Sequence, residues 1–232
     1  MFDIGPFVFP IFSGVSEQGV FRVDKFLGAG FWIGKRGHFL TCKHVLAQIE
    51  PKQVAAIARL PFSSSAPYLR IVETVSSRRF DVAVGRAFVK SDVPVLPTYS
   101  GPIGLGLEIQ AFGFADAGKE PGQYFLDLRL LRGHVTRLCQ DSLGLETPSV
   151  MEVSFGSPSG FSGTPLLVDS AVVGMLHNNL ETKIGHHSIL DVTENGNRYK
   201  EDAYRVYEYG AAHMMHELSD FIEDACNSLG KN

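Results

Sequence analysis

Short apolar stretches separated by turn residues dominate the first ninety or so positions of the chain. Each stretch is too short for a helix that could bury one face, and their spacing is typical of strands in a meander or a barrel. We therefore expect one antiparallel β unit in this half. Its strands are predicted at residues 20–23, 30–33, 38–41, 54–57, 69–72 and 81–84.

A segment rich in proline and glycine, residues 91–106, interrupts this pattern. It contains Pro94, Pro97 and Pro102, and such a composition indicates a crossover linker. A second set of short apolar stretches follows the linker, so the sequence predicts two β units of similar size, arranged as a double barrel. The strands of the second unit are predicted at 108–112, 124–130, 133–136, 150–154, 165–168 and 171–176.

The C-terminal part of the chain contains three segments with different patterns of polar and apolar residues. Residues 178–203 are polar and contain Asn195-Gly196, which predicts a long surface loop. A last strand is expected over residues 204–212. Apolar residues then recur at steps of three and four from Met214 to Ala225, which predicts one amphipathic helix that ends before Gly230.

Composition narrows the class of protein. A chain of 232 residues with 44% hydrophobic content can bury a substantial core. The net charge of −4 and the lack of a large Lys/Arg cluster argue against a nucleic-acid partner. No stretch has the length of a transmembrane helix, and residues 1–11 make a poor signal peptide, so we expect no membrane association.

Cysteine usage indicates the compartment. Cys42, Cys139 and Cys226 are few, odd in number and widely spaced. They are expected to be free thiols rather than a disulfide framework or a zinc site. A reducing compartment, most simply the cytoplasm, is the predicted location.

A candidate nucleophile is Ser162, which lies within Gly160-Phe161-Ser162-Gly163 just before an apolar run. A serine between glycines can be held in a tight turn with its backbone N–H groups exposed, which is one way to place a nucleophile beside an oxyanion hole. The alternative is an ordinary loop of an all-β protein, where small turn residues also collect.

A histidine and an aspartate precede Ser162 in the sequence, each in the kind of local setting that a serine hydrolase needs. His44 follows the strand predicted at 38–41, and a histidine there can lean over a cleft between two β units. Asp81 begins an otherwise apolar strand. Taken singly, His44 would be a surface or capping residue, and Asp81 would be a turn residue. Together, a largely buried Asp81 would orient His44, whose other ring nitrogen would accept the hydroxyl proton of Ser162.

These pieces, in this order, resemble the trypsin-like (chymotrypsin-fold) serine peptidases. The matching motifs are Gly28-Ala-Gly-Phe31 with Leu40-Thr-Cys-Lys-His44-Val, then Asp81-Val-Ala-Val, then Gly160-Phe-Ser162-Gly-Thr-Pro. The resemblance implies an all-β fold of two antiparallel six-stranded β-barrels with a C-terminal α-helix in a single domain, residues 1–232. The N-terminal barrel would span about residues 16–90, the linker 91–106, and the C-terminal barrel and helix about 107–229.

The resemblance also implies the roles of the site residues. His44, Asp81 and Ser162 would be a catalytic triad, and the backbone N–H groups of Gly160 and Ser162 would form the oxyanion hole. No cofactor and no metal are expected. The walls of the substrate pocket would come from Gly156, Ser157, His177, Asn178, Asn179 and Gly210.

Departures from the family pattern refine this expectation. Phe161 stands where secreted trypsins carry an aspartate, and the chain has no Ile-Val-Gly-Gly N-terminus to pair with one. The chain is therefore most similar to the intracellular bacterial, disulfide-free branch. A non-glycine at 161 is expected to leave the oxyanion hole poorly formed until a substrate or an activating protein partner arrives.

Specificity is less well defined by the sequence. Gly156 is not acidic, so cleavage after Lys or Arg is not supported, although Glu208 or Glu201 could substitute. His177 suggests a preference for Glu or Gln before the cleaved bond. The alternative is that His177 is a hydrogen-bonded polar residue with no part in specificity.

Other chemical motifs are weaker. His186 and His187, with His177 or His213, lack the spaced cysteine or carboxylate partners of a metal site, and Cys42 is expected to be a packed thiol. The sequence thus predicts a serine endopeptidase acting on a protein or peptide substrate. The alternatives are a catalytically silent binding or scaffold module, and a single-site self-cleaving or esterase-like hydrolase.

Overall fold

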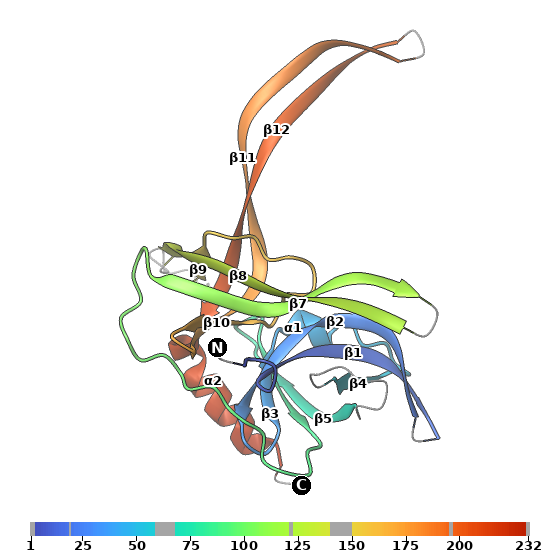
Figure 1. Ribbon diagram of the computed structural model, residues 1–232, viewed down its shortest axis with the longest axis vertical. Helices are drawn as coiled ribbons and strands as arrows, with labels where there is room; N and C mark the ends of the chain where they lie inside the picture. The colour runs from blue at the N-terminus through green and yellow to red at the C-terminus, as the bar shows by residue number, and fades with distance from the viewer. Residues whose placement is uncertain are drawn as a thin grey trace.

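The two predicted β units fold into two closed antiparallel barrels of six strands each. The computed structural model describes residues 3–18, 20–58, 68–120, 123–139, 150–194 and 197–230. Neighbouring strands follow the order β1-β2-β3-β6-β5-β4 in the first barrel and β10-β11-β12-β9-β8-β7 in the second (Figure 1). The all-β, double-barrel fold with a C-terminal helix is therefore confirmed.

The first barrel begins at Val8, earlier than the expected boundary near residue 16. Residues 8–14 are all buried, because this strand pairs with β2 on one edge and with β4 on the other. The predicted stretches 20–23 and 30–33 belong to one long strand, β2. The elements of this barrel are β1 (Val8–Glu17), β2 (Val20–Gly34), β3 (His38–Thr41), α1 (Lys43–Leu46), β4 (Val54–Ile57), β5 (Leu69–Ser76) and β6 (Ala83–Ala87).

Aromatic side chains fill the first barrel. Phe9, Trp32 and Phe39 are each at most 2% exposed, and the Phe9 ring lies 4.3 Å from that of Trp32 and 5.8 Å from that of Phe39. Burial of each large apolar side chain contributes about 2 kcal/mol to stability. This core gives the barrel a rigid wall on which the site can be built.

The second barrel starts after the linker. The linker is held against this barrel, since Tyr99 N–H donates to Val172 O at 2.9 Å and Val172 N–H donates to Pro97 O at 2.8 Å. The predicted stretches 124–130 and 133–136 form one strand, β8. The strands are β7 (Glu108–Glu120), β8 (Gln123–Cys139), β9 (Val150–Val153), β10 (Pro165–Val168), β11 (Ala171–Glu194) and β12 (Asn197–Met214).

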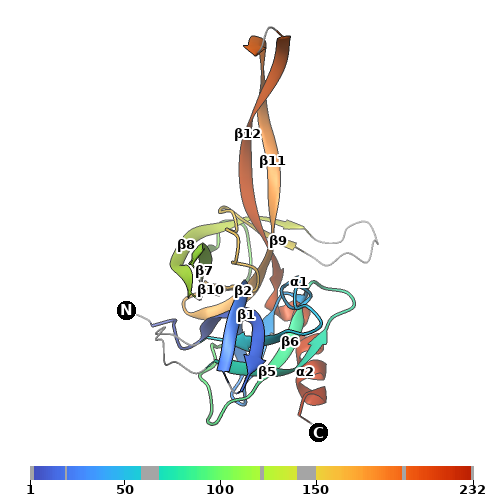
Figure 2. The same cartoon turned by 90° about the vertical axis from the view of Figure 1, so that its right-hand side faces the viewer.

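The prediction of a surface loop at residues 178–203 is wrong, because this segment forms a long β-hairpin. Strands β11 and β12 pair from Gly174↔Met214 out to Glu194↔Asn197, with bulges along the way. The hairpin projects well away from both barrels (Figure 2). Bulges on β11 interrupt the alternation of apolar and polar residues along that strand, which is why its sequence resembles a loop.

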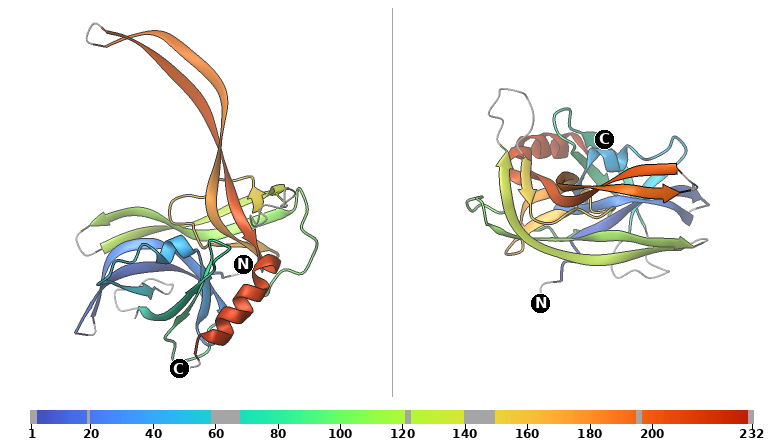
Figure 3. Two further views of the ribbon diagram at one scale, coloured as in Figure 1. Left: turned by 180° about the vertical axis from the view of Figure 1, so that it is seen from behind. Right: turned by 90° about the horizontal axis from the view of Figure 1, so that it is seen from above.

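The C-terminal helix α2 (Met215–Ser228) forms as predicted. Met215, Leu218 and Ala225 are buried and join the apolar cluster of the first barrel. The chain thus closes the second barrel with β12 and then packs back along the first (Figure 3). None of the helices in the described part of the chain is long and apolar enough to span a membrane.

Candidate active site

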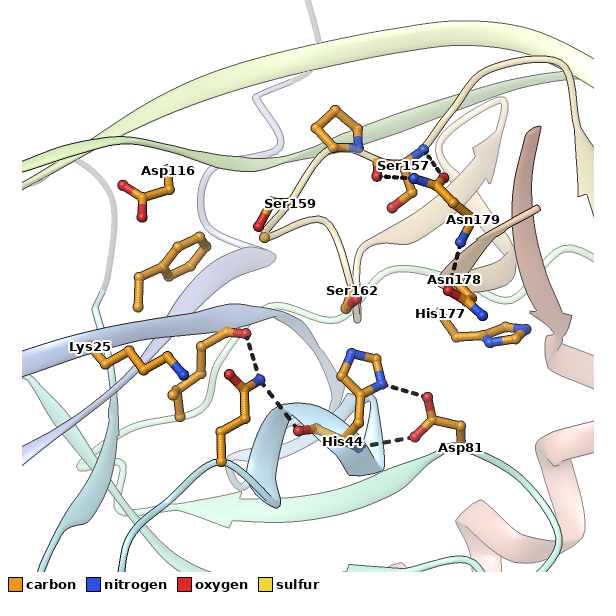
Figure 4. A pocket seen from close by; sticks show the side chains of 15 residues that line it. Lys25, His44, Asp81, Asp116, Ser157, Ser159, Ser162, His177, Asn178 and Asn179 are labelled. Atoms are coloured by element: carbon orange, nitrogen blue, oxygen red, sulfur yellow. Dashed lines mark hydrogen bonds and ion pairs between the residues drawn. The ribbon is translucent and has the colours of Figure 1, made fainter. Parts of the chain in front are cut away.

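A pocket of about 750 Å³ lies where the two barrels meet (Figure 4). The first barrel contributes His44 and Asp81 to its lining, and the second contributes Ser162. The three residues that the sequence singled out are therefore in one pocket, although they are far apart in the chain.

Strand pairing brings His44 to Asp81. His44 lies on the single turn α1 directly after β3, and Asp81 lies two residues before β6, while β3 and β6 pair at Thr41↔Ala83. The Nδ1 atom of His44 is 2.5 Å from Oδ2 of Asp81, and the His44 backbone N–H donates to Oδ1 at 3.0 Å. Two hydrogen bonds from one residue therefore fix both carboxylate oxygens.

The Asp81 side chain is 32% exposed, so it is half-buried rather than largely buried as expected. Burial raises the pKa of its carboxyl, but the hydrogen bonds from His44, helped by the charges of His44 and His177, outweigh this and hold the pKa below its usual value. Asp81 is thus an anion at neutral pH, and it favours the His44 tautomer that carries its proton on Nδ1.

The loop that carries Ser162 depends on two glycines. Gly160 has φ of +95° and Gly163 has φ of +90°, a region that side-chain-bearing residues rarely adopt. A Cβ on Gly163 would also lie 2.1 Å from the carbonyl oxygen of Ala29. This close approach lets the Ser162 carbonyl accept a hydrogen bond from Ala29 N–H at 2.9 Å, which ties the loop to the first barrel.

Two backbone N–H groups of this loop are unoccupied. Phe161 N–H donates to Pro158 O at 3.0 Å and Gly163 N–H donates to Leu176 O at 2.9 Å. In contrast, the N–H groups of Gly160 and Ser162 donate to no other group within the described residues. Two free donors flanking one occupied donor make an arrangement that can receive an oxyanion.

Phe161 anchors the loop from behind. Its side chain is fully buried in the core of the second barrel. Its ring packs against Gly113, where a Cβ would come too close to the ring. Apolar burial of this ring therefore fixes the loop to the second barrel. The residue that departs from the family pattern therefore lies inside the barrel core rather than in the pocket.

Ser162 and His44 face each other without a hydrogen bond. Figure 4 shows Ser162 on the side of the His44 ring that is turned away from Asp81, where the second ring nitrogen lies. Among the described residues, no hydrogen bond joins the Ser162 hydroxyl to that nitrogen. Catalytic hydrogen bonds in unliganded sites are often long and tighten only when substrate binds.

Four of the six residues expected to wall the pocket do so: Ser157, His177, Asn178 and Asn179. Asn179 bridges two walls, because its amide accepts from Ser157 N–H and donates to Ser157 O at 2.8 Å. The other two residues, Gly156 and Gly210, are not part of the pocket lining. Gly210 is buried behind the wall, where its N–H donates to Phe155 O, and Gly156 lies outside the pocket lining.

Glu208 lies beside Gly156, since a Cβ on Gly156 would be 2.8 Å from Oε2 of Glu208. Glu208 is exposed and does not line the pocket, so its carboxylate is not at the pocket floor. The side chain of Glu201 lies outside the described residues.

Two imidazoles stack at the pocket wall: His177, which lines the pocket, and His213, which is buried. The ring of His177 stacks on that of His213, and His213 also meets Phe80 edge-on at 5.6 Å. Burial lowers the pKa of His177 to about 4 and that of His213 to about 3, and the Asp81 charge opposes this only in part. Both rings are therefore neutral at pH 7 in the pocket without substrate.

A metal does not fit the cluster of Cys42, His44 and Asp81, whose ligand atoms lie within 4.8 Å of one another. His44 Nδ1 is already bonded to Asp81, and the Cys42 thiol donates to Leu176 O at 3.3 Å. Burial, reinforced by the Asp81 charge, raises the pKa of Cys42 well above its usual value, so it stays a thiol. The side chains of His186 and His187 lie outside the described residues.

Sequence reasoning missed several residues of the lining. They are Lys25, Phe26, Leu27, Gln48 and Asp116. Pro158 and Ser159, which were expected in the wall together with Gly156 and Ser157, also line the pocket. Gln48 lies in the turn after α1, and the other missed residues lie on β2 and β7, whose position beside the pocket depends on how the barrels close and is not indicated by any local pattern.

Comparisons with known proteins agree with the geometry. Residues 28–175 match the family model described as a trypsin-like peptidase domain. The structure is similar to that of "HtrA-type protease AlgW with decapeptide", with a TM-score of 0.63 and 16% sequence identity over 94% of this chain. The chain spans 64% of the length of that protein. No curated protein matches by sequence.

Proposed function

Because this chain belongs to the family of trypsin-like peptidase domains, whose fold is that of serine proteases, we propose that it is a serine endopeptidase. One observation carries the proposal. The bonded pair His44–Asp81 shares a pocket with Ser162, whose loop presents two free backbone N–H groups. These are the parts that acyl transfer requires.

In the proposed reaction, the Ser162 oxygen attacks the carbonyl carbon of the substrate peptide bond while His44 accepts the hydroxyl proton on Nε2. The C–N bond of the tetrahedral intermediate then breaks, and His44 returns the proton to the leaving amine. Water repeats the sequence on the acyl-enzyme, which releases the acid and restores Ser162.

Asp81 positions the base. Its bond to Nδ1 holds that nitrogen protonated and turns Nε2 toward Ser162, and its negative charge stabilises the imidazolium that forms during attack. The second carboxylate oxygen is held by the His44 backbone N–H, so the carboxylate cannot rotate away.

The backbone N–H groups of Gly160 and Ser162 would bind the oxyanion. Loss of one such donor typically lowers the rate by about 10²–10³.

We propose protein or peptide segments as substrates, recognised by Ser157, His177, Asn178 and Asn179 in the pocket wall. The free thiols Cys42, Cys139 and Cys226 support a reducing, cytoplasmic location and a kinship with the disulfide-free branch of the family. Restraint by a narrow substrate range or by an activating protein partner is part of the same proposal.

A fluorophosphonate probe tests this function. Wild type, Ser162→Ala and the matched control Ser159→Ala, a serine three residues away in the same loop, are incubated with the probe and then with a peptide library. We expect labelling and cleavage in wild type and Ser159→Ala, and neither in Ser162→Ala.

The remaining outcomes identify the alternatives. An unlabelled wild type that binds peptides without cutting them would show a catalytically silent module. A labelled wild type that hydrolyses only esters, or cuts only its own chain, would show an esterase-like or self-cleaving protein.

A further inference from the structure

The outer part of the β11–β12 hairpin has no second layer. Strand β9 pairs with β12 only from Gly210 to Ala212, and β10 pairs with β11 only up to Met175. Beyond Asn179 the two strands pair with each other alone within the described residues, and Figure 1 shows them clear of both barrels. A two-stranded ribbon by itself is at best marginally stable in water, so we expect one of its faces to pack against another layer.

The register of the hairpin sorts its residues into two faces. Every shift of register lies on β11, at residues 177, 185 and 191, whereas β12 pairs continuously from Asn197 to Met214. Alternate residues of β12 therefore lie on opposite faces, and each shares its face with the residue of β11 that pairs with it. We call the face that contains Tyr207 the tyrosine face, and the face that contains Val206 the charged face.

The two faces differ in chemistry. The tyrosine face is mostly apolar, whereas most residues of the other face are charged or polar. The apolar residues of the tyrosine face are Leu180, Ile184, Ile189, Val192, Tyr199, Ala203, Tyr207 and Tyr209, and its polar residues are Thr182, His187, Glu194, Asn197, Glu201 and Arg205. The charged residues of the charged face are Glu181, Lys183, Arg198, Lys200, Asp202 and Glu208.

We propose that the tyrosine face packs against the same face of a second copy of this chain, with the two hairpins antiparallel. A twofold axis that crosses the strands at Ala203 gives this arrangement, because it lays each β12 over the other in the reverse direction. The barrels lie at one end of the hairpin (Figure 2), so the axis places the two pairs of barrels at opposite ends, where they do not collide.

Charges on the tyrosine face are complementary to themselves about this axis. Arg205 and Glu201 lie two residues to either side of Ala203 on β12. In the antiparallel pair each arginine is therefore placed opposite the glutamate of the other copy, and twofold symmetry gives this match twice. An unrelated partner would have to supply the same pattern of opposite charges independently, so the pattern selects a second copy.

Apolar residues match in the same way. Tyr207 and Tyr199 lie at equal distances from the axis, so tyrosine is placed opposite tyrosine. The residues of β11 that pair with the arginine and the glutamate are Ile184 and Ile189, so isoleucine is placed opposite isoleucine. An aromatic side chain can bury about 150–250 Å², so the tyrosines and aliphatic residues of this face together approach the roughly 800 Å² per partner of a stable interface.

Lysine substitutions at two adjacent positions test which face is covered. The side chains of Tyr207 and Val206 are 47% and 49% exposed, but they lie on opposite faces. In analytical ultracentrifugation we expect wild type and Val206→Lys to sediment as dimers at micromolar concentration. Tyr207→Lys should raise the dissociation constant of the dimer by about tenfold or more. Circular dichroism melts establish that both variants fold.

Charge reversal tests the register. Arg205→Glu places two glutamates opposite each other twice in each dimer, which should raise the dissociation constant by about tenfold or more. Glu201→Arg should weaken the dimer to a similar extent. The double variant Arg205→Glu/Glu201→Arg restores both matches of opposite charge and should dimerise as tightly as wild type. Lys200→Glu, a reversal on the charged face, is the control and should have no effect.

The remaining outcomes would overturn the proposal. A wild type that stays monomeric at the highest attainable concentration would mean that no second copy covers the tyrosine face. A dimer that Tyr207→Lys leaves intact would be held by another surface. If Val206→Lys disrupts the dimer as strongly, or if the double charge reversal fails to restore it, the copies do not pack in this register. Sedimentation requires no cleavage, so the result is independent of the proposed protease function.

Discussion

The imidazole of His177 stacks on that of His213, with ring centroids 4.1 Å apart and 10° between the ring planes. His213 is 3% exposed, and neither of its ring nitrogens has a hydrogen-bond partner among the described residues. The charge of Asp81 acts on both rings. The pair therefore links the interior of the second barrel to the carboxylate that orients His44.

This pair predicts acid sensitivity. Both pKa values are lowered on folding from 6.5, to about 4 for His177 and about 3 for His213, so the unfolded chain binds more protons below pH 6.5. Stability should be complete above pH 6.5 and fall as the pH drops toward 4 and then 3. The His177 shift corresponds to about 3 kcal/mol. Urea midpoints measured from pH 8 to pH 4 check this.

The variant His213→Leu serves as the comparison. It removes a buried group with unpaired polar atoms and replaces it with an apolar side chain of similar size, so stability at pH 7 should rise by about 1–3 kcal/mol. The fall between pH 6.5 and pH 4 should become shallower. A wild type whose urea midpoint does not change over that range would contradict the buried neutral pair.

Asp81→Asn should abolish the orientation of the base without disturbing the fold. An amide at this position no longer enforces the Nδ1-protonated tautomer, and the loss in kcat is expected to be on the order of 10⁴. The rate of fluorophosphonate labelling of Ser162 measures the effect. Since Asp81 is 32% exposed, the thermal midpoint should change little. Undiminished labelling would show that His44 does not act through Asp81.

Phe161→Ala should loosen the Ser162 loop. Truncation of a fully buried phenylalanine costs about 3–5 kcal/mol, and the loop would lose its anchor in the second barrel. Labelling of Ser162 should slow at temperatures where the variant is still folded. Phe161→Leu, which keeps most of the apolar volume, should restore the labelling rate. If Phe161→Ala labels as fast as wild type, the anchor has no part in shaping the site.

Gly163→Ala should prevent the barrels from joining properly. Its Cβ would lie 2.1 Å from Ala29 O and 2.7 Å from Thr41 Oγ1, and φ is +90°. We expect a loss of more than about 4 kcal/mol, seen as a collapse of the urea midpoint. Gly104→Ala, where a Cβ meets nothing within 4 Å, should shift stability by no more than about 0.5 kcal/mol. Similar midpoints for the two variants would refute the close approach.

The sequence was most informative for short, largely buried strands of four residues. The stretches at 38–41, 54–57 and 165–168 were predicted with the bounds that β3, β4 and β10 have. His44, Asp81 and Ser162 were also identified, because each follows or precedes such a strand in a recognisable motif. That they lie in one pocket follows from barrel closure, which pairs β3 with β6 and ties Ser162 to Ala29.

Other features left no local signal. The β11–β12 hairpin resembles a loop in sequence, because bulges on β11 interrupt the alternation of apolar and polar residues. Strand β1 was missed for a different reason, since residues 8–14 include Pro10 and Gly14, two residue types that are uncommon inside strands. The pairing of His177 with His213 depends on the register Met175↔His213 between β11 and β12, and no pattern in the sequence indicates it.

The bond from Ala29 N–H to the Ser162 carbonyl means that the proposed nucleophile is held by a barrel to which it does not belong. Helix α2 reinforces that dependence, because it leaves the second barrel and buries Met215 and Leu218 against the first. Neither half of the chain, made alone, would hold a competent nucleophile. If the proposed function holds, two fragments divided within the linker would hydrolyse substrate only after they reassemble, so this fold is suited to a split reporter whose signal reports that its two halves have met.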